Sequence, residues 1–403
     1  MILNGVLDNL RLFELKLEIL TPTIITSTVG YRGFVHESLV HFIPGSILRG
    51  ALLSEAIRVG SLEKEDINRL ALSPDFALTP LLAIGKRGEN LNHISPLKDS
   101  LVAHALSYTS KWPGEKRVKS PGAVRLKNES AWKLIRELFL KAKHGELGWG
   151  PGEGVSIEGR PVRRVNRHWE VVGTGDWTMA YVEVGIDRSR GASAPGILYA
   201  YEFLKPGCTY TGLMAVQKNS LLMKFLNERE KIKLYLGRGL SRGFGGAKLT
   251  MRKINPEEIQ TNWIKNEIKS GEKVVFMALS PVFIDDRFPP IPVPPKKGDE
   301  LVLDFNWYTK MLGEALNVKL KVKLVYGRKR ASWVYRGWSL RTGTPKAPIK
   351  FQGMGSLLVC EATNAIPNHV ALFLPVLGLG PSASFGFNQL IPLEQDPFWG
   401  EYR

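Results

Sequence analysis

The stretch LGRGLSRGFGGAKL at residues 236–249 has a counterpart, LGLGPSASFGFNQL, at residues 377–390. Both begin with Leu-Gly-x-Gly, contain a serine in the middle and carry a Gly-Phe or Phe-Gly pair before a final apolar segment. Each stretch closes one half of the chain, so the two form a weak internal repeat. The repeat predicts two copies of one α+β unit.

The elements around these stretches follow the same plan in each half. Alternation of apolar and charged residues from Phe13 to Ile19 predicts a strand. Pro44-Gly45-Ser46 then predicts a helix through Ile57, with Ser46 as its cap. In the second half, residues 274–283 and 318–326 predict strands on either side of an amphipathic helix near 304–316. Repeated strand–helix–strand units fit a ferredoxin-like or RRM-like sheet with helices on one face.

A chain of 403 residues exceeds the size of one hydrophobic core, so two domains are expected. We place an N-terminal domain at residues 1–260 and a C-terminal domain at 270–403, separated by a polar stretch. The N-terminal domain carries a loop-rich insertion at about 75–175, which includes one predicted helix at 130–143.

Composition limits the class of protein. Hydrophobic residues make up 44% of the chain and charged residues 23%, as in ordinary globular proteins. Two cysteines, Cys208 and Cys360, are too few for a disulfide framework or a four-thiolate zinc site and favour a reducing compartment. No apolar run approaches the ~20 residues of a membrane span, and no signal peptide is visible. We therefore expect a cytoplasmic protein that does not bind membranes.

The chain carries 55 Lys and Arg against 38 Asp and Glu, a formal charge of +17. Such an excess favours nucleic acid as the partner first and an anionic membrane surface second. Neither basic run described below is long or amphipathic enough to suggest a membrane-surface helix. From Ala315 to Cys360 there is no acidic residue, and aromatic residues alternate with the cations, as single-strand binding surfaces require. The alternative is a half-buried strand with one solvated face. Candidate contacts in this window are Arg328, Lys329, Arg330, Trp333 and Arg336.

A second basic run, GRPVRRVNRHW at residues 159–169, contains Arg163 and Arg164. It follows a glycine-rich stretch that is interpreted as a mobile loop or a hairpin insertion. The basic run itself is interpreted either as a disordered surface loop or as a flexible arm that becomes ordered on RNA.

The first glycine stretch sets Arg238, Ser241 and Arg242 among Gly237, Gly239 and Gly243. Backbone N–H groups and guanidinium groups together suit a polynucleotide backbone. A dinucleotide-binding loop needs a strand before it and a helix after it, and no P-loop motif is present, so no small-molecule cofactor is predicted. The alternative is a turn that needs glycine only for tight geometry. This alternative is stronger for residues 377–390, which carry no cation.

Four separated segments resemble one known family. IPGSILRGALLSEA at residues 43–56 looks like the first signature of the RAMP superfamily, the RNA-binding proteins of CRISPR effector complexes. The glycine stretch at 236–249 matches the second signature, and residues 186–212 and 337–359 resemble further blocks of its members. The pattern is most similar to the subunit of type III systems, in particular type III-D, that holds the 5′ end of the guide RNA.

The resemblance implies two fused, modified RRM-like domains with a basic loop insertion that works as a thumb. It implies crRNA and other subunits of the effector complex as partners. By position, the contacts to the guide would come from Gly45, Ser46, Arg49, Gly237, Arg238, Ser241, Arg242 and Gly243, with Arg188 and Arg190 as secondary candidates.

Catalysis is the remaining question, because some members of this superfamily cut RNA. His36 and His41 lie where a general acid or base of a guide-processing member could be placed. No Asp occurs between Asp8 and Asp66, so the carboxylate of the target-cutting members is missing and no metal site is predicted. We therefore predict a non-catalytic RNA-binding subunit. The alternatives are an endoribonuclease of the same superfamily using His36 or His41, and an assembly protein whose basic window binds an acidic protein.

Overall fold

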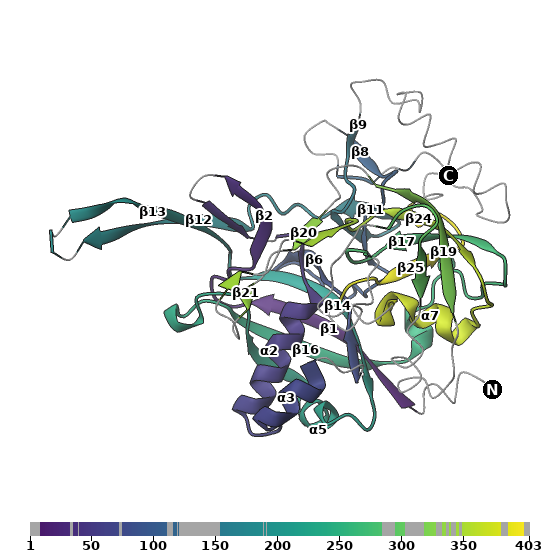
Figure 1. The fold of residues 1–403 in the computed structure, drawn as a ribbon, viewed down its shortest axis with the longest axis horizontal. Coiled ribbons are helices and arrows are strands. Elements are labelled where there is room, and N and C mark those ends of the chain that lie inside the picture. The colour runs from purple at the N-terminus through teal and green to yellow at the C-terminus, as the bar shows by residue number, and fades with distance from the viewer. Residues whose placement is uncertain are drawn as a thin grey trace.

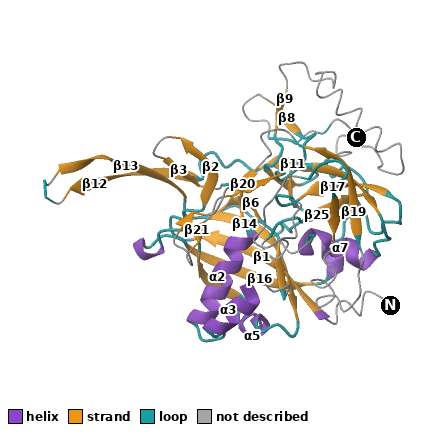
Figure 2. Ribbon diagram, viewed as in Figure 1, coloured by secondary structure: helices purple, strands orange, loops and turns teal. Residues whose placement is uncertain are grey.

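The computed structural model describes residues 9–32, 35–38, 40–71, 75–110, 116–118, 120, 154–187, 189–190, 192–283, 295–302, 318–327, 333–335, 338–339, 344–345, 349–379 and 386–398. Strands dominate and helices are few (Figure 2). The prediction of an α+β fold is confirmed. The helices expected at 130–143 and 304–316 lie outside the described residues.

The first sheet is antiparallel, with strand order β15-β16-β1-β14-β6-β4 and β5 beside β14. Its strands are β1 (Leu10–Ile19), β4 (Phe42–Ile43), β5 (Phe76–Leu78), β6 (Leu81–Lys86), β14 (Cys208–Gln217), β15 (Lys231–Tyr235) and β16 (Gly246–Ile254). The helices α2 (Gly45–Arg58), α3 (Lys64–Ala71) and α5 (Leu222–Asn227) gather on one side of it (Figure 1).

Alternation along β1 explains this layering, because successive side chains point to opposite faces of a strand. Phe13, Leu15, Leu17 and Ile19 pack into one core with the apolar face of α2. Leu10 and Leu12 join the core of the second half of the chain. The strand predicted from Phe13 to Ile19 is thus present, and apolar residues on both of its faces are buried.

The second half forms another antiparallel sheet, with order β18-β19-β24-β17-β25. Its elements are β17 (Lys273–Ala278), β18 (Glu300–Val302), β19 (Lys319–Tyr326), β24 (Leu357–Ala362), α7 (Asn368–Leu377) and β25 (Leu390–Leu393). By their order in the chain, β17, β19, β24 and β25 occupy the same relative places as β1, β6, β14 and β16 of the first sheet.

A four-stranded sheet has the strand order β12-β13-β3-β2, and the long hairpin of β12 and β13 extends away from the body (Figure 1). Its strands are β2 (Thr26–Arg32), β3 (Val35–Ser38), β12 (Thr178–Asp187) and β13 (Ala192–Leu204). Along β12 the side chains of Met179, Tyr181 and Val182 are exposed.

The basic run at residues 159–169 is not a mobile loop or arm. It forms the hairpin of β10 (Pro161–Val165) and β11 (His168–Val171), which pairs with β7 (Ser100–Val102). Val162 and Trp169 anchor this hairpin because their side chains are buried in the core of the second half of the chain. The remaining short strands are β8 (Tyr108–Ser110), β9 (Gly154–Ser156), β20 (Trp333–Tyr335), β21 (Trp338–Ser339), β22 (Thr344–Pro345) and β23 (Ile349–Phe351).

Among the described helices, none combines the length and apolar character needed to cross a membrane. Cys208 and Cys360 are free, buried thiols on different sheets. Burial raises the pKa of Cys208 to about 11.

A buried polar cluster ties the C-terminal segment to the insertion. Asp396 accepts hydrogen bonds from the backbone N–H of Phe398 and the hydroxyl of Ser120, and its Oδ1 lies 3.0 Å from Nε2 of His104. On the other side of the ring, Nδ1 of His104 lies 3.2 Å from the hydroxyl of Ser107. Although this order resembles a catalytic triad, Ser107 is fully buried, so a substrate has no access to its oxygen.

We predict that Asp396→Ala lowers the free energy of unfolding by about 3–5 kcal/mol, since it leaves buried polar partners unsatisfied. Urea denaturation of the full chain measures the change. Asp176→Ala is the matched control: its carboxylate is exposed and pairs with Lys86, so the loss should stay within about 1 kcal/mol. Equal losses in the two variants would contradict a structural role for the Asp396 cluster.

Candidate functional site

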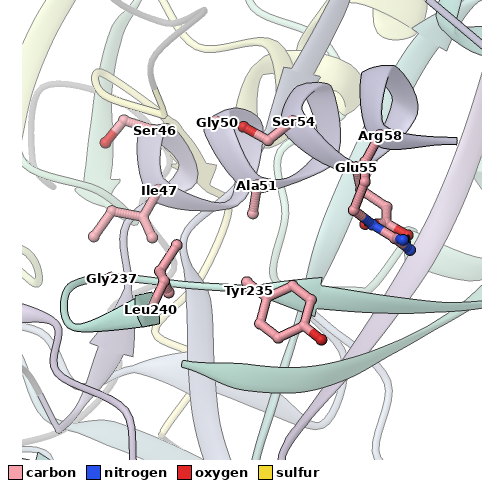
Figure 3. A pocket seen from close by; sticks show the side chains of 10 residues that line it. All are labelled: Ser46, Ile47, Gly50, Ala51, Ser54, Glu55, Arg58, Tyr235, Gly237 and Leu240. Atoms are coloured by element: carbon pink, nitrogen blue, oxygen red, sulfur yellow. Dashed lines mark hydrogen bonds and ion pairs between the residues drawn. The ribbon is translucent and has the colours of Figure 1, made fainter. Parts of the chain in front are cut away.

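Two segments that are far apart in the sequence meet at one pocket. The helix α2 supplies one wall, and the end of β15 together with the first glycine stretch supplies the other (Figure 3). The pocket has a volume of about 600 Å³ and is lined by Ser46, Ile47, Gly50, Ala51, Ser54, Glu55, Arg58, Tyr235, Gly237 and Leu240. The structure thus brings Ser46 and Gly237, two of the predicted contacts, to one site.

Residues 236–249, the glycine loop, turn sharply between β15 and β16. Backbone φ angles are positive at Gly237, Gly239 and Gly243, a conformation that favours glycine. At Gly237 any side chain would also collide with the carbonyl oxygen of Ile24. The glycines of this loop are therefore required by the tight turn itself, whether or not the loop also binds a ligand.

The cations of the glycine loop lie on the surface. Arg238, Ser241 and Arg242 are exposed. The backbone N–H of Arg238 donates to the carbonyl of Ile24, at 3.0 Å, which fixes the loop at this point. No hydrogen bond or ion pair engages the guanidinium of Arg238 within the part of the chain that the structure describes.

Arg49 has a different place from the one predicted. Its side chain is only 3% exposed, its guanidinium lies 3.7 Å from the ring centroid of Phe76, and it donates to the carbonyls of Phe76 and Leu70. Burial lowers the pKa of Arg49 to about 9, so the group stays charged at neutral pH. Arg49 thus joins α2 to α3 and to the first residue of β5, and its guanidinium is not on the surface, as the predicted RNA contact would require.

Ser46 does not cap α2. The helix begins at Gly45 after Pro44, and no side chain caps its N-terminus. Gly45 lies against the second glycine stretch, where a Cβ added to it would lie only 3.0 Å from the Cα of Gly386. In the same stretch, Nε2 of Gln389 donates to the carbonyl of Leu78, at 2.9 Å. The described part of the second stretch therefore packs at the junction of the two halves.

Charged and aromatic groups line the far end of the pocket. Nε and Nη2 of Arg58 donate to the two carboxylate oxygens of Glu55, at 2.7 and 2.6 Å. The hydrogen bond to Glu55 is the main cause of the raised pKa of Arg58. Tyr235 is 42% exposed, and the ammonium of Lys233 lies 5.6 Å from its ring centroid.

Sequence reasoning missed Tyr235, Glu55 and Arg58. The sequence does contain a signal for Tyr235. In the strand KIKLY, Lys231, Lys233 and Tyr235 alternate with the apolar Ile232 and Leu234, which predicts that Tyr235 shares the exposed face with the two lysines, as the structure shows. Glu55 and Arg58 are one helical turn apart, but only the folded chain shows that they line the pocket at the end where Tyr235 lies (Figure 3).

The other predicted contacts are scattered. Arg190 is exposed in the turn between β12 and β13. Arg163 pairs with Glu89 and donates to the carbonyl of Ile84, at 2.7 Å. Arg164 is half-buried on β10, and Trp333 lies on β20, opposite Phe351 of β23. Arg188, Arg328, Lys329, Arg330 and Arg336 lie outside the described residues.

The face of the first sheet opposite α2 carries charges that are already matched. Lys16 donates to the carbonyls of Leu91 and Asn92, so the chain after β6 crosses this face. Glu18 pairs with Lys248, and Glu14 pairs with Arg252. This arrangement leaves the pocket and its glycine loop as the stronger candidate for binding.

Neither candidate histidine is among the residues that line the pocket. His36 lies on β3 and His41 follows it, outside the pocket. Nδ1 of His41 lies 3.2 Å from the hydroxyl of Thr174, and burial lowers the pKa of His41 to about 4. No group of three or more His, Cys, Asp or Glu in the described chain could hold a metal ion.

No family model matches the sequence, and no curated protein matches it. Among solved structures, the chain is similar to one in the cryo-EM structure of the type III-B Cmr-beta bound to cognate target RNA and AMPPnP. The identity is 12%, 86% of each chain is covered and the TM-score is 0.38. It is also similar to oligomeric Cmr4 from Pyrococcus furiosus, with 14% identity, a TM-score of 0.27 and coverage of 61% of this chain and 99% of that one. Because both TM-scores are low, function is inferred below from the residues of this chain.

The lowered pKa of His41 predicts an acid-sensitive fold. The unfolded chain takes up a proton near pH 6.5 and the folded chain near pH 4, so His41 should cost stability as the pH falls through this window. The loss is at most about 3 kcal/mol. Denaturation of the wild type and His41→Gln across these pH values should give a flatter profile for the variant. Parallel profiles would contradict the assignment.

Proposed function

We propose that this chain is a non-catalytic RNA-binding subunit of a type III CRISPR effector complex. In this proposal it grips the 5′ handle of the crRNA in the cytoplasm and anchors neighbouring subunits. One observation carries the proposal: the two segments with the family's signatures meet at one pocket, and the exposed cations of the glycine loop lie beside it. A polyanion with exposed bases is the ligand that such an arrangement suits.

The architecture supports the proposal. Each half places its strands in the order expected of a ferredoxin-like sheet, with β16-β1-β14-β6 in the first and β25-β17-β24-β19 in the second. We propose two tandem, modified RRM domains at about residues 1–260 and 270–403. Because β5 and β6 belong to the first sheet, the insertion begins after Lys86 in this proposal and not near residue 75.

The long hairpin of β12 and β13 is proposed as the thumb that the resemblance implies. It leaves the body of the protein (Figure 1), and Arg190 lies in its turn. The basic run at 159–169 does not form such an extension, because its hairpin is packed into the core.

Nothing in the described residues favours the endoribonuclease alternative. His41 lies outside the pocket, and its ring is in a partly buried contact with the hydroxyl of Thr174. Incubation of the purified chain with CRISPR repeat RNA tests this: metal-independent cleavage that is lost in His36→Ala or His41→Ala would favour an enzyme.

The handle-binding proposal predicts that the double variant Arg238→Ala/Arg242→Ala binds guide RNA a few kcal/mol more weakly, because two guanidinium groups leave the surface. The slope of log K against log salt should fall by about 1.4, since each phosphate that is no longer neutralised on a single strand accounts for about 0.7. Fluorescence anisotropy over a salt series measures both.

The matched control is Lys296→Ala/Lys297→Ala, which removes the same charge from exposed positions beside β18. If both double variants lose the same affinity, the charge acts without a specific site. Unchanged affinity and slope in the arginine variant would refute handle binding by this loop. Salt-resistant binding of an acidic protein in the absence of RNA would favour the assembly alternative.

A further inference from the structure

The helix α2 contains a glycine that the fold does not explain. Gly50 lies in the interior of the helix, where glycine is less favourable than alanine by roughly 0.5–1 kcal/mol. A Cβ added at Gly50 would meet no heavy atom within 4 Å, so no neighbouring element requires its absence. Gly50 is exposed and lines the pocket. Its missing side chain therefore leaves the entrance open and contributes nothing to packing.

The opposite wall presents apolar and aromatic surface to the same space. Leu240 is 47% exposed and Tyr235 is 42% exposed, although both are large residues at the edge of a well-packed core. In Figure 3, Ile47 and Ala51 of α2 point toward Leu240 across the pocket. A flat ligand fits between such walls, and an exposed tyrosine ring is a stacking surface for a nucleobase.

Polar groups at the end of the pocket suit the rest of a nucleotide. Arg58 uses Nε and Nη2 to bind Glu55, which leaves Nη1 available at a side chain that is 61% exposed. Glu55 thereby holds the guanidinium in one orientation. A phosphate or a base edge placed on Tyr235 would lie beside this fixed donor.

From this geometry we propose that the pocket between α2 and the glycine loop receives one unstacked nucleobase of single-stranded RNA, with Tyr235 as its stacking surface and Gly50 as its open entrance. This inference rests on the proposed function and adds to it. The loop cations bind the RNA backbone, whereas the pocket holds a single base. A volume of about 600 Å³ lies within the range of small-ligand sites, roughly 300–1,000 Å³.

The test uses the full chain and a fluorescent oligoadenylate of about ten nucleotides. Tyr235→Leu should weaken binding by about ten-fold, since stacking of one base is lost, whereas Tyr235→Trp should retain binding. Gly50→Leu should weaken binding to a similar extent by filling the entrance. Gly50→Ala should raise the melting temperature by about 1–2 °C, which shows that the position tolerates a side chain.

A second measurement locates the base. Oligoadenylates with a single abasic ribose at each position in turn should bind the wild type about ten-fold more weakly at one position, and this loss should disappear in Tyr235→Leu. If Tyr235→Leu, Gly50→Leu and every abasic probe bind like their parents, the pocket inference is wrong and the proposed function stands. If the wild type binds no oligoadenylate and no guide RNA, the proposed function and the inference are both wrong.

Discussion

The central strand β1 is hydrogen-bonded to β14 along one edge and to β16 along the other. Both of its faces carry buried side chains, so its direction and register are fixed by two cores. The segment that follows β1 is hydrogen-bonded to the glycine loop. The backbone N–H of Gly246 donates to Oγ1 of Thr21, that of Gly245 to the carbonyl of Pro22, and that of Arg238 to the carbonyl of Ile24. The position of the loop cations therefore follows from the position of β1.

The two similar glycine stretches have different roles in the fold. In the first, the turn faces Ile24 and leaves Arg238 on the surface. In the second, Gly386 lies against Gly45 at the start of α2. The second half of the chain thus packs against the start of α2, the helix that forms one wall of the pocket in the first half. A change at Gly386 is expected to act on the pocket through α2, although Gly386 does not line it.

The local sequence pattern was sufficient to predict an element where the spacing of its apolar residues alone determines which face is buried. Alternation predicted the strand from Phe13 to Ile19 and the strand at 318–326, and the Pro-Gly-Ser segment predicted α2. Pattern failed where tertiary contacts outweighed it. The resemblance to the RAMP superfamily placed Arg49 among the RNA contacts, yet carbonyls of Leu70 and Phe76 bind its guanidinium inside the protein. The basic run at 159–169 suggested a loop, yet it forms a hairpin whose Trp169 is buried. The ring of Trp169 packs edge-on against that of Phe398, which lies near the end of the chain, and local pattern does not report such a contact.

The distribution of charge now separates cations that support the fold from cations available to a ligand. Arg252, Lys248 and Lys265 each pair with a carboxylate, so their charge is locally balanced. Arg238 lies on an exposed loop whose backbone is fixed, and its guanidinium has no ion pair within the described chain. A fixed backbone lowers the entropic cost of placing that guanidinium against a phosphate. The excess of +17 favours general attraction to a polyanion. In the proposed function, the hydrogen-bonded glycine loop would give that attraction a defined place and orientation.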